Sequence, residues 1–222
     1  MENDMKKTSQ VPVIKGIIRA VIAICSLGAL TLGGCSVLPK AEGEPSLWRL
    51  VTPSVETSSG PVGCPVTLRL IETRASDAIA RRDMAYSRTP QSLAYYRDNR
   101  WSAAPATMLD EILDEGLTGQ SWVRNVVRGG ARVATDLALY CEVEHLEHQL
   151  GYVDGRVRLK VACSWYRSGE RELLETLSFD RTVEIERNDA SHYAAGAQAL
   201  VADFMRAIGR QGRSLGNLCT NR

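Results

Sequence analysis

The sequence predicts a single sheet domain of the α/β or α+β class with two main helices. Three consecutive segments between residues 137 and 185 alternate apolar and polar residues, which is typical of strands with one buried face. Two other segments, beginning near residues 105 and 190, carry apolar residues at helical spacing. A chain of 222 residues can bury an adequate core in one domain, and no internal repeat divides it.

The domain is predicted to open with a strand and a hairpin. Residues 66–71, Val-Thr-Leu-Arg-Leu-Ile, alternate in the manner of a first strand. Residues 84–87 and 93–96 resemble the two arms of a hairpin, and Thr-Pro-Gln-Ser at 89–92 supplies turn residues between them.

A helix is predicted next, because Pro105 suits a first helical turn. Its apolar stripe consists of Met108, Leu109, Ile112, Leu113 and Leu117. Gly116 or Gly119 is positioned to end it. Residues 122–127 then indicate a short element whose type the pattern does not decide, before the break at Gly129-Gly130.

The second half is predicted to be an antiparallel meander followed by a helix. The apolar positions of the three alternating segments are Leu137, Leu139, Cys141 and Val143, then Val157, Leu159, Val161, Cys163 and Trp165, then Leu177, Phe179, Val183 and Ile185. Consecutive strands of this kind indicate a sheet with one buried face. Asp189 or Ser191 is expected to cap the last helix, whose stripe runs from Tyr193 to Ile208.

Residues 1–34 resemble a bacterial lipoprotein signal peptide. Four basic residues precede a run of thirteen uncharged residues, 20–32, which is too short to span a bilayer. Leu32-Gly33-Gly34-Cys35 follows and resembles a lipobox, in which cleavage leaves Cys35 as a lipidated N-terminus. A signal-anchor helix with a chance cysteine is the alternative. Ser36, in place of an aspartate, implies sorting to the periplasmic face of the outer membrane.

Three regions follow from this interpretation: a signal peptide at 1–34, a lipidated N-terminus and tether at 35–63, and the folded domain at 64–222. The tether contains Pro-, Gly-, Ser- and Thr-rich stretches at 39–45 and 52–63. Between them, Leu47-Trp48-Arg49-Leu50 is a short extended piece able to dock on the domain. The mature chain carries 23 basic and 24 acidic residues, so it lacks the basic excess of nucleic-acid-binding proteins.

Four cysteines remain after Cys25 leaves with the signal peptide and Cys35 is lipidated: Cys64, Cys141, Cys163 and Cys219. Disulfides persist in the periplasm, and four cysteines allow three connectivities. Cys141 and Cys163 lie on the apolar faces of consecutive strands, but their direct opposition requires an odd-length loop or a bulge. A Cys141–Cys163 bridge with Cys64–Cys219 as its companion is one hypothesis, and buried free thiols are the alternative.

No catalytic, cofactor or metal site is predicted. His145 and His148 point to opposite faces of one strand, so they cannot easily share an ion. The spacing of the cysteines is not that of a zinc site, and no local nucleophile motif such as G-x-S-x-G occurs. We therefore expect a protein that is not an enzyme.

The stretch Tyr95-Tyr96-Arg97-Asp98-Asn99-Arg100-Trp101-Ser102-Ala103-Ala104-Pro105, followed by an amphipathic helix, resembles the core motif of the ABC-type transport auxiliary lipoproteins. The preceding residues 81–86 and the alanine-rich late helix are also similar to that family, and the resemblance covers roughly residues 47–210. It implies a three-layer α/β domain with a mixed, largely antiparallel sheet and two main helices. The additional cysteines and the weak start at residues 47–50 depart from the family pattern.

The resemblance implies a non-catalytic accessory subunit of a lipid transporter that contains a mammalian-cell-entry (MCE) protein and an ABC permease and ATPase. It also implies attachment to the outer membrane, with homo-oligomerisation as a further possibility. Trp48, Tyr95, Tyr96 and Trp101 are the candidate partner-binding residues. The alternative for these aromatic residues is structural, because aromatics at a strand–helix junction usually belong to the core. An outer-membrane assembly lipoprotein that chaperones lipopolysaccharide or a porin is the alternative function, followed by a purely structural envelope role.

Overall fold

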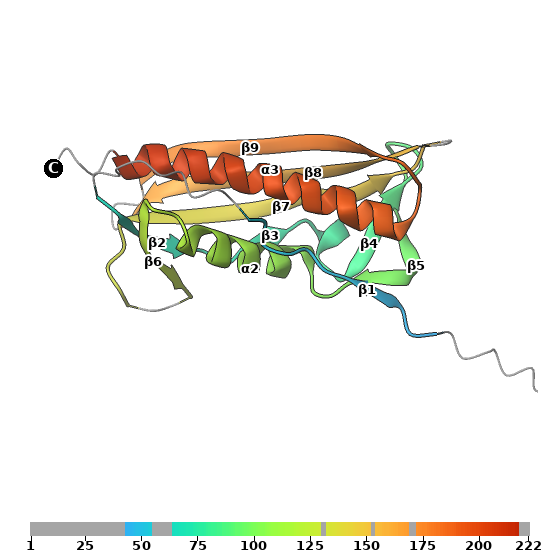
Figure 1. Ribbon diagram of the computed structural model, residues 1–222, viewed down its shortest axis with the longest axis horizontal. Helices are drawn as coiled ribbons and strands as arrows, with labels where there is room; N and C mark the ends of the chain where they lie inside the picture. The colour runs from blue at the N-terminus through green and yellow to red at the C-terminus, as the bar shows by residue number, and fades with distance from the viewer. Residues whose placement is uncertain (1–42, 55–63, 130–131, 152–153, 169–171, 218–222) are drawn as a thin grey trace, which may run out of the picture. The chain divides into compact units, whose positions relative to one another are not determined.

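The computed structural model describes residues 43–54, 64–129, 132–151, 154–168 and 172–217. All the described elements belong to one compact unit, Glu44–Arg222. The expected α/β domain with a mixed sheet and two main helices is confirmed (Figure 1).

The central strand of the sheet is β7 (Leu137–Gln149). One edge of β7 pairs antiparallel with β8 (Gly155–Arg167), which pairs antiparallel with β9 (Glu172–Ile185). These are the longest ladders of the sheet, so the predicted meander is confirmed. Along most of their length, β7 and β8 bury alternate side chains, as the two-residue period of a strand requires.

The other edge of β7 is covered by three short strands in succession, all parallel to it. They are β2 (Val66–Leu70), β3 (Arg74–Ala75) and β4 (Asp83–Ser87), with the 3-10 helix η1 (Asp77–Ile79) before β4. The chain thus follows β7 from one end to the other in steps.

The predicted hairpin is present, because β5 (Ala94–Trp101) pairs antiparallel with β4. Its turn is held by Ser92, whose hydroxyl accepts the backbone N–H groups of Arg88 and Thr89 at 3.0 Å each. The element of undecided type is the strand β6 (Val123–Arg128), which lies parallel to β2.

The folded part begins before residue 64, which corrects the expected domain boundary. Residues Ser46–Trp48 form β1, which pairs parallel with β5 from Asn99 to Trp101. Leu50 is buried in the core. A strand with a ladder partner and a buried neighbour is part of the domain, so these residues are not free tether.

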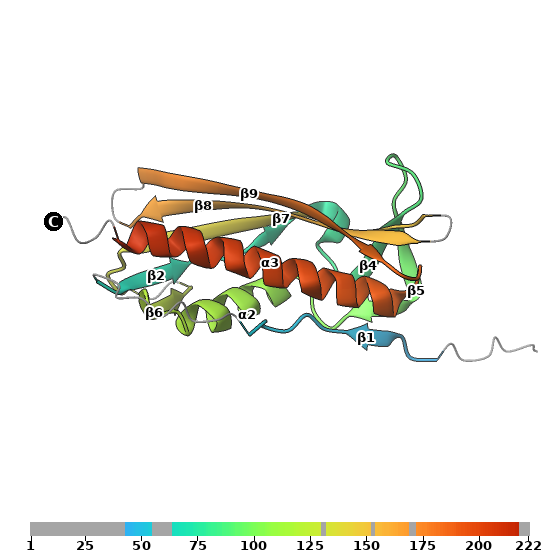
Figure 2. The same ribbon diagram turned by 45° about the horizontal axis from the view of Figure 1, so that its top comes forward.

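Two helices lie on the inner side of the sheet (Figures 1 and 2). Helix α2 (Pro105–Thr118) starts at the expected proline, and α3 (Ala190–Asn217) starts where Asp189 Oδ1 accepts the backbone N–H of His192 at 2.9 Å. The helices approach closely, since a Cβ added at Gly116 of α2 would lie 2.6 Å from the terminal carbon of Met205 of α3.

A register shift between Val143 and His145 makes β7 carry one extra residue opposite β8. On one side of the shift His145 faces Lys160, and on the other Cys141 faces Cys163 directly. The sulfur atoms of these two cysteines form a disulfide. The required bulge is therefore what brings the pair into opposition. Cys64 is a free cysteine among the described residues, whereas Cys219 lies outside them.

Candidate functional site

Trp101 is a core residue, which corrects its assignment as a partner-binding candidate. Its side chain is fully buried and meets the ring of Tyr193 edge-to-face, with centroids 5.3 Å apart. The burial follows from its place, because Trp101 ends β5 immediately before helix α2. A side chain without exposed surface cannot contact a partner, so the structural alternative holds for this residue.

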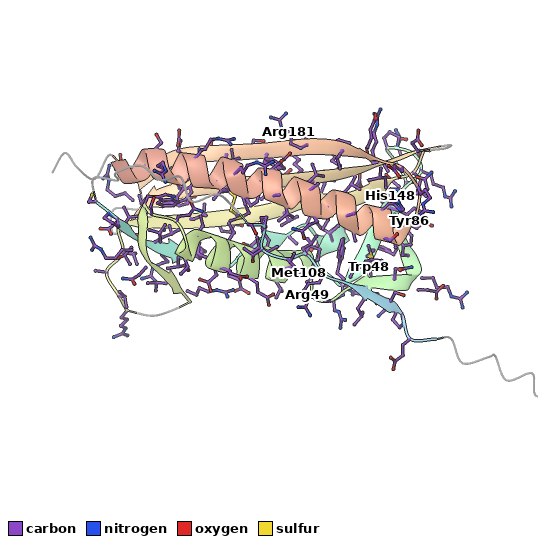
Figure 3. All side chains as sticks on the ribbon, in the orientation of Figure 1. Trp48, Arg49, Tyr86, Met108, His148 and Arg181 are labelled. Atoms are coloured by element: carbon purple, nitrogen blue, oxygen red, sulfur yellow. A yellow bond between two sulfur atoms is a disulfide. The ribbon has the colours of Figure 1, made fainter. Side chains whose placement is uncertain are left out.

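Tyr96 belongs to a half-buried aromatic cluster. Its hydroxyl is 2.7 Å from Nδ1 of His148, and its ring lies near Tyr86 and Tyr193. Burial, followed by the negative charge of Asp189, raises the pKa of Tyr96 to about 12, so the phenol is neutral. Figure 3 shows His148 and Tyr86 together at the end of the domain that carries β4 and β5.

Tyr95 is the most exposed of the candidates, and Trp48, like Tyr96, is partly exposed. Tyr95 is 45% exposed, and its hydroxyl donates to the carbonyl oxygen of Ala78 at 2.8 Å. Trp48 is partly buried, with its indole N–H donating to Asn99 Oδ1 at 2.9 Å. Because Tyr95 and Tyr96 are neighbours on one strand, they face opposite sides, and the four candidates do not form one patch.

The outer side of the β7–β8–β9 sheet divides into two chemically different parts. Toward the β7–β8 turn it carries cross-strand ion pairs: Glu144–Lys160 at 2.5 Å, Arg158–Asp180 at 2.7 Å and Arg156–Glu184 at 3.0 Å. Such pairs are typical of a solvated sheet face.

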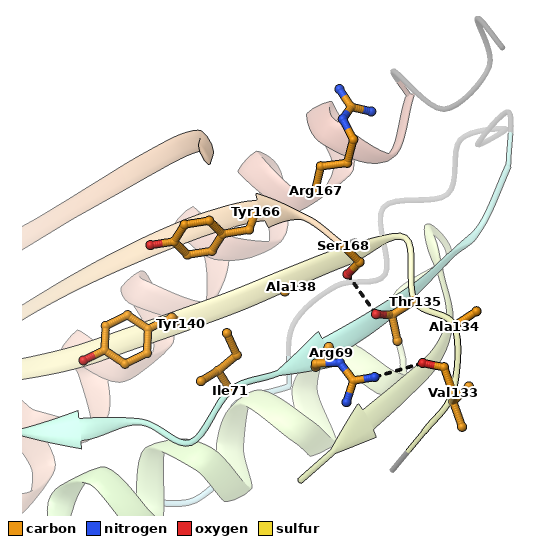
Figure 4. A pocket seen from close by; sticks show the side chains of 10 residues that line it. All are labelled: Arg69, Ile71, Val133, Ala134, Thr135, Ala138, Tyr140, Tyr166, Arg167 and Ser168. Carbon is orange, nitrogen blue, oxygen red and sulfur yellow. Dashed lines mark hydrogen bonds between the residues drawn. The ribbon is translucent and has the colours of Figure 1, made fainter. Parts of the chain in front are cut away.

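Toward the other end, the same side of the sheet is largely apolar and hollowed. A pocket of about 740 Å³, here called the outer-face pocket, opens beside β2, β7 and β8 (Figure 4). Its lining residues are Arg69, Ile71, Val133, Ala134, Thr135, Ala138, Tyr140, Tyr166, Arg167 and Ser168.

The register of β7 and β8 explains the hollow. Ala138 lies directly opposite Tyr166, and Tyr140 lies two residues further along the same face of β7. A methyl group between two tyrosines leaves space that a larger residue would fill. Ile71, which is 41% exposed, borders this space. Its backbone N–H donates to the carbonyl oxygen of Leu139 at 2.9 Å, which extends the pairing of β2 with β7 by one residue.

Several polar groups of the outer-face pocket make contacts within the protein. Arg69 donates to the carbonyl oxygens of Gly129 at 3.1 Å and Val133 at 2.9 Å. The hydroxyl of Thr135 donates to that of Ser168 at 2.8 Å. Burial, followed by the nearby Glu142, raises the pKa of Tyr140, which keeps this wall uncharged.

Sequence reasoning missed the outer-face pocket. Ala138, Tyr140 and Tyr166 occupy the positions between the apolar residues of the alternating strands, which the pattern assigns to solvent. Two tyrosines at outward positions were the available signal. That signal gains meaning only from the register that brings Tyr166 beside Ala138.

Across the described ranges, no group of three or more His, Cys, Asp or Glu side chains is arranged to hold a metal ion. His148 is buried and His145 is not, as opposite faces of one strand require. In the same part of the chain, no helix has the length and apolar character needed to cross a membrane.

Residues 49–209 match the sequence profile of the family described as ABC-type transport auxiliary lipoprotein component. The chain belongs to this family. The crystal structure of protein XCC0632 from Xanthomonas campestris, titled with the family model DUF330, superimposes with a TM-score of 0.72 at 13% identity, covering 80% of this chain and 99% of the other.

A crystal structure described only as an uncharacterized protein superimposes with a TM-score of 0.57 at 13% identity, over 76% of this chain and 98% of the other. At these identities the two likenesses establish the fold alone. The search of curated proteins found no match.

Proposed function

We propose that this auxiliary lipoprotein is a non-catalytic, lipid-anchored accessory subunit of an MCE-type ABC transporter that moves lipids across the periplasm. The family match over residues 49–209 carries the proposal, because it ties the chain to ABC-type transport. Near-neutral charge and the absence of a readable catalytic motif in the sequence support a role in docking.

The anchor of the proposed subunit is Cys35, acylated after cleavage of residues 1–34. Stable membrane attachment requires two lipid signals, which a multiply acylated cysteine supplies. Eleven residue steps separate Cys35 from Ser46, the first residue of β1, so Ser46 remains within about 40 Å of the anchor at full extension. A tether extending to residue 63 would have reached about 100 Å, so the early start of the fold keeps the domain near the membrane.

The segment that follows β1 is fastened to both helices. The side-chain amide of Gln198 on α3 pairs with the backbone of Val51 in both directions, each bond measuring 2.8 Å. The hydroxyl of Thr52 donates to Glu115 on α2 at 2.5 Å. A force on the anchor is therefore transmitted through residues 51 and 52 to the two helices.

The docking surface of this proposal includes Tyr95 near the start of β5 and Trp48 on β1, which pairs with the other end of β5 at Asn99–Trp101. Tyrosine and tryptophan are frequent at the energetic centres of protein interfaces. In this proposal the surface lies near the N-terminal strand β1, to which the tether connects.

Purification of the full-length lipoprotein in mild detergent tests the function. We expect the MCE protein and the ABC permease and ATPase to co-purify, and Tyr95→Glu to reduce their recovery at least tenfold. Leu173→Glu is the matched control, because Leu173 is similarly exposed, at 54%, on the distant strand β9. Recovery of assembly factors for lipopolysaccharide or porins in place of the transporter contradicts the proposal.

Genetic tests separate anchoring from docking. Cys35→Ala should abolish palmitate labelling and leave the precursor uncut. Deleting the gene should produce the same envelope phenotype as deleting the MCE gene, and the double deletion should be no more severe. Additive phenotypes contradict a shared pathway.

A further inference from the structure

We propose that the outer-face pocket binds one hydrocarbon chain of an amphiphile whose anionic head group lies in solvent beside Arg69. The proposal deepens the proposed function by naming a ligand class for this subunit, and it rests on that function only for the source of the ligand. The argument comes from the lining of the pocket, its opening and the contrast with the rest of the outer face.

The lining favours hydrocarbon over a polar ligand. Ile71, Val133, Ala134 and Ala138 supply aliphatic surface, with Tyr140 and Tyr166 as walls. Of the four hydroxyl groups in the lining, those of Thr135 and Ser168 already bond to each other. A polar ligand would have to break that pair, whereas a hydrocarbon chain displaces only water from apolar surface, which is the favourable step in apolar binding.

The size and shape of the outer-face pocket agree with one chain. About 740 Å³ lies within the range of roughly 300–1,000 Å³ that is typical of small-molecule sites. The outer-face pocket is open to solvent on one side, so a chain can lie in it while its head remains hydrated.

Charge indicates the sign of the head group. The lining includes Arg69 and contains no Asp or Glu, and the second arginine of the lining, Arg167, is paired with Glu172 at 2.8 Å. The carbonyl oxygens of Gly129 and Val133 accept hydrogen bonds from Arg69 and hold its guanidinium at the rim. A carboxylate or a phosphate is the head group that such an arginine attracts.

The rest of the outer face shows that the apolar hollow is specific to one end. From Glu144 to Glu184 the outward positions form ion pairs across three strands. Around the outer-face pocket the strands carry alanine, isoleucine and tyrosine instead, and the ion pair Arg167–Glu172 lies at its end. Exposed apolar surface concentrated in one hollow is typical of a binding site.

The test uses the mature chain, residues 35–222, with Cys35→Ala so that no attached acyl chain competes. The fold begins at Glu44, so this chain retains the whole domain. Calorimetric titration with palmitate, lysophosphatidylglycerol and uncharged dodecanol is expected to give saturable 1:1 binding of the two anionic amphiphiles. The comparison of palmitate with the lysophospholipid distinguishes a free fatty acid from a phospholipid as the better source of the chain.

Two variants reduce the hollow by different means. Ala138→Phe fills it and should weaken palmitate binding at least tenfold. Ile71→Gln should weaken it severalfold, and because Ile71 is 41% exposed this change is compatible with folding. Thr182→Phe, an exposed position on β9 outside the pocket lining, is the matched control and should leave affinity unchanged.

Absence of saturable binding to the folded chain, or equal affinity in Ala138→Phe and Thr182→Phe, overturns the proposal. If Ala138→Phe abolishes capture of the MCE protein while no amphiphile binds the wild type, the pocket is a protein contact and the lipid proposal is wrong. If the amphiphiles bind but no transporter component co-purifies, the pocket stands and the proposed function fails.

Discussion

Two glycines of helix α3 should respond in opposite ways to the same substitution. A Cβ added at Gly212 would clash with the ring of Trp122, lying 2.5 Å from its Cζ2, and would lie 3.0 Å from Cη2 of Trp165. Both rings are fully buried and meet edge-to-face with centroids 6.2 Å apart, so neither can swing into solvent. At Gly209 the nearest atom to the added Cβ is Gln120 Oε1 at 3.9 Å, which is ordinary contact.

The magnitudes follow from two opposing terms. Alanine in place of glycine within a helix lowers the free energy of the folded state by about 1 kcal/mol relative to the unfolded state. Overpacking a rigid core costs about 1–3 kcal/mol. Gly209→Ala should therefore gain up to about 1 kcal/mol of unfolding free energy, and Gly212→Ala should lose about 1 kcal/mol.

Thermal unfolding followed by circular dichroism measures the difference. For a domain of this size, 1 kcal/mol corresponds to about 2–4 °C in Tm, so the two variants should differ by about 4–8 °C. The close approach of α3 to the tryptophan pair is refuted if Gly212→Ala melts at or above the wild-type temperature.

Three further predictions concern the cysteines and a buried histidine. Replacing Cys141 and Cys163 together by alanine should lower the unfolding free energy by about 3 kcal/mol, because the bridge closes a loop of 22 residues; denaturant titration of both proteins measures this, and unchanged stability contradicts it. Cys64 should pair with Cys219, because Gly216 and Val66, which lie within three residues of the two cysteines, are close together: a Cβ at Gly216 would lie 3.9 Å from Val66 Cγ1. Peptide mapping without reduction tests the bridge, and an alkylatable Cys64 disproves it. Burial lowers the pKa of His148, so the unfolded state binds the proton more tightly than the folded state. The contribution of His148 to the free energy of unfolding is therefore complete above pH 6.5 and should fall by up to about 1.4 kcal/mol per pH unit below it. Urea titrations at a series of pH values measure this slope, and His148→Gln should remove the part that His148 contributes.

Much of the fold was predictable because its long elements are locally determined. The strands β7, β8 and β9 are 13 or 14 residues long, and alternation along much of each specifies both the strand and its buried face. Helix α2 has a proline at its start and a regular stripe, and α3 has Asp189 at its start. In these segments the local preference and the tertiary packing agree.

The short elements depended on partners far away in the chain. β1 has three residues, too few to show a period. It is a strand because it pairs with the edge of β5, which lies about fifty residues further along the sequence. β6 pairs with β2, and α2 is among the elements that separate the two strands in the sequence. Neither segment's own sequence shows which strand it will pair with.

The sites were decided by register and packing. The sequence by itself identified the lipidation candidate Cys35, the strands that carry Cys141 and Cys163, and the condition that a bulge must align the two cysteines. Tertiary structure buried Trp101 under Tyr193 and placed Ala138 opposite Tyr166. Composition specifies which residue is aromatic or small, but exposure and hollows arise between segments, so only the pairing of strands and the seating of helices determine them.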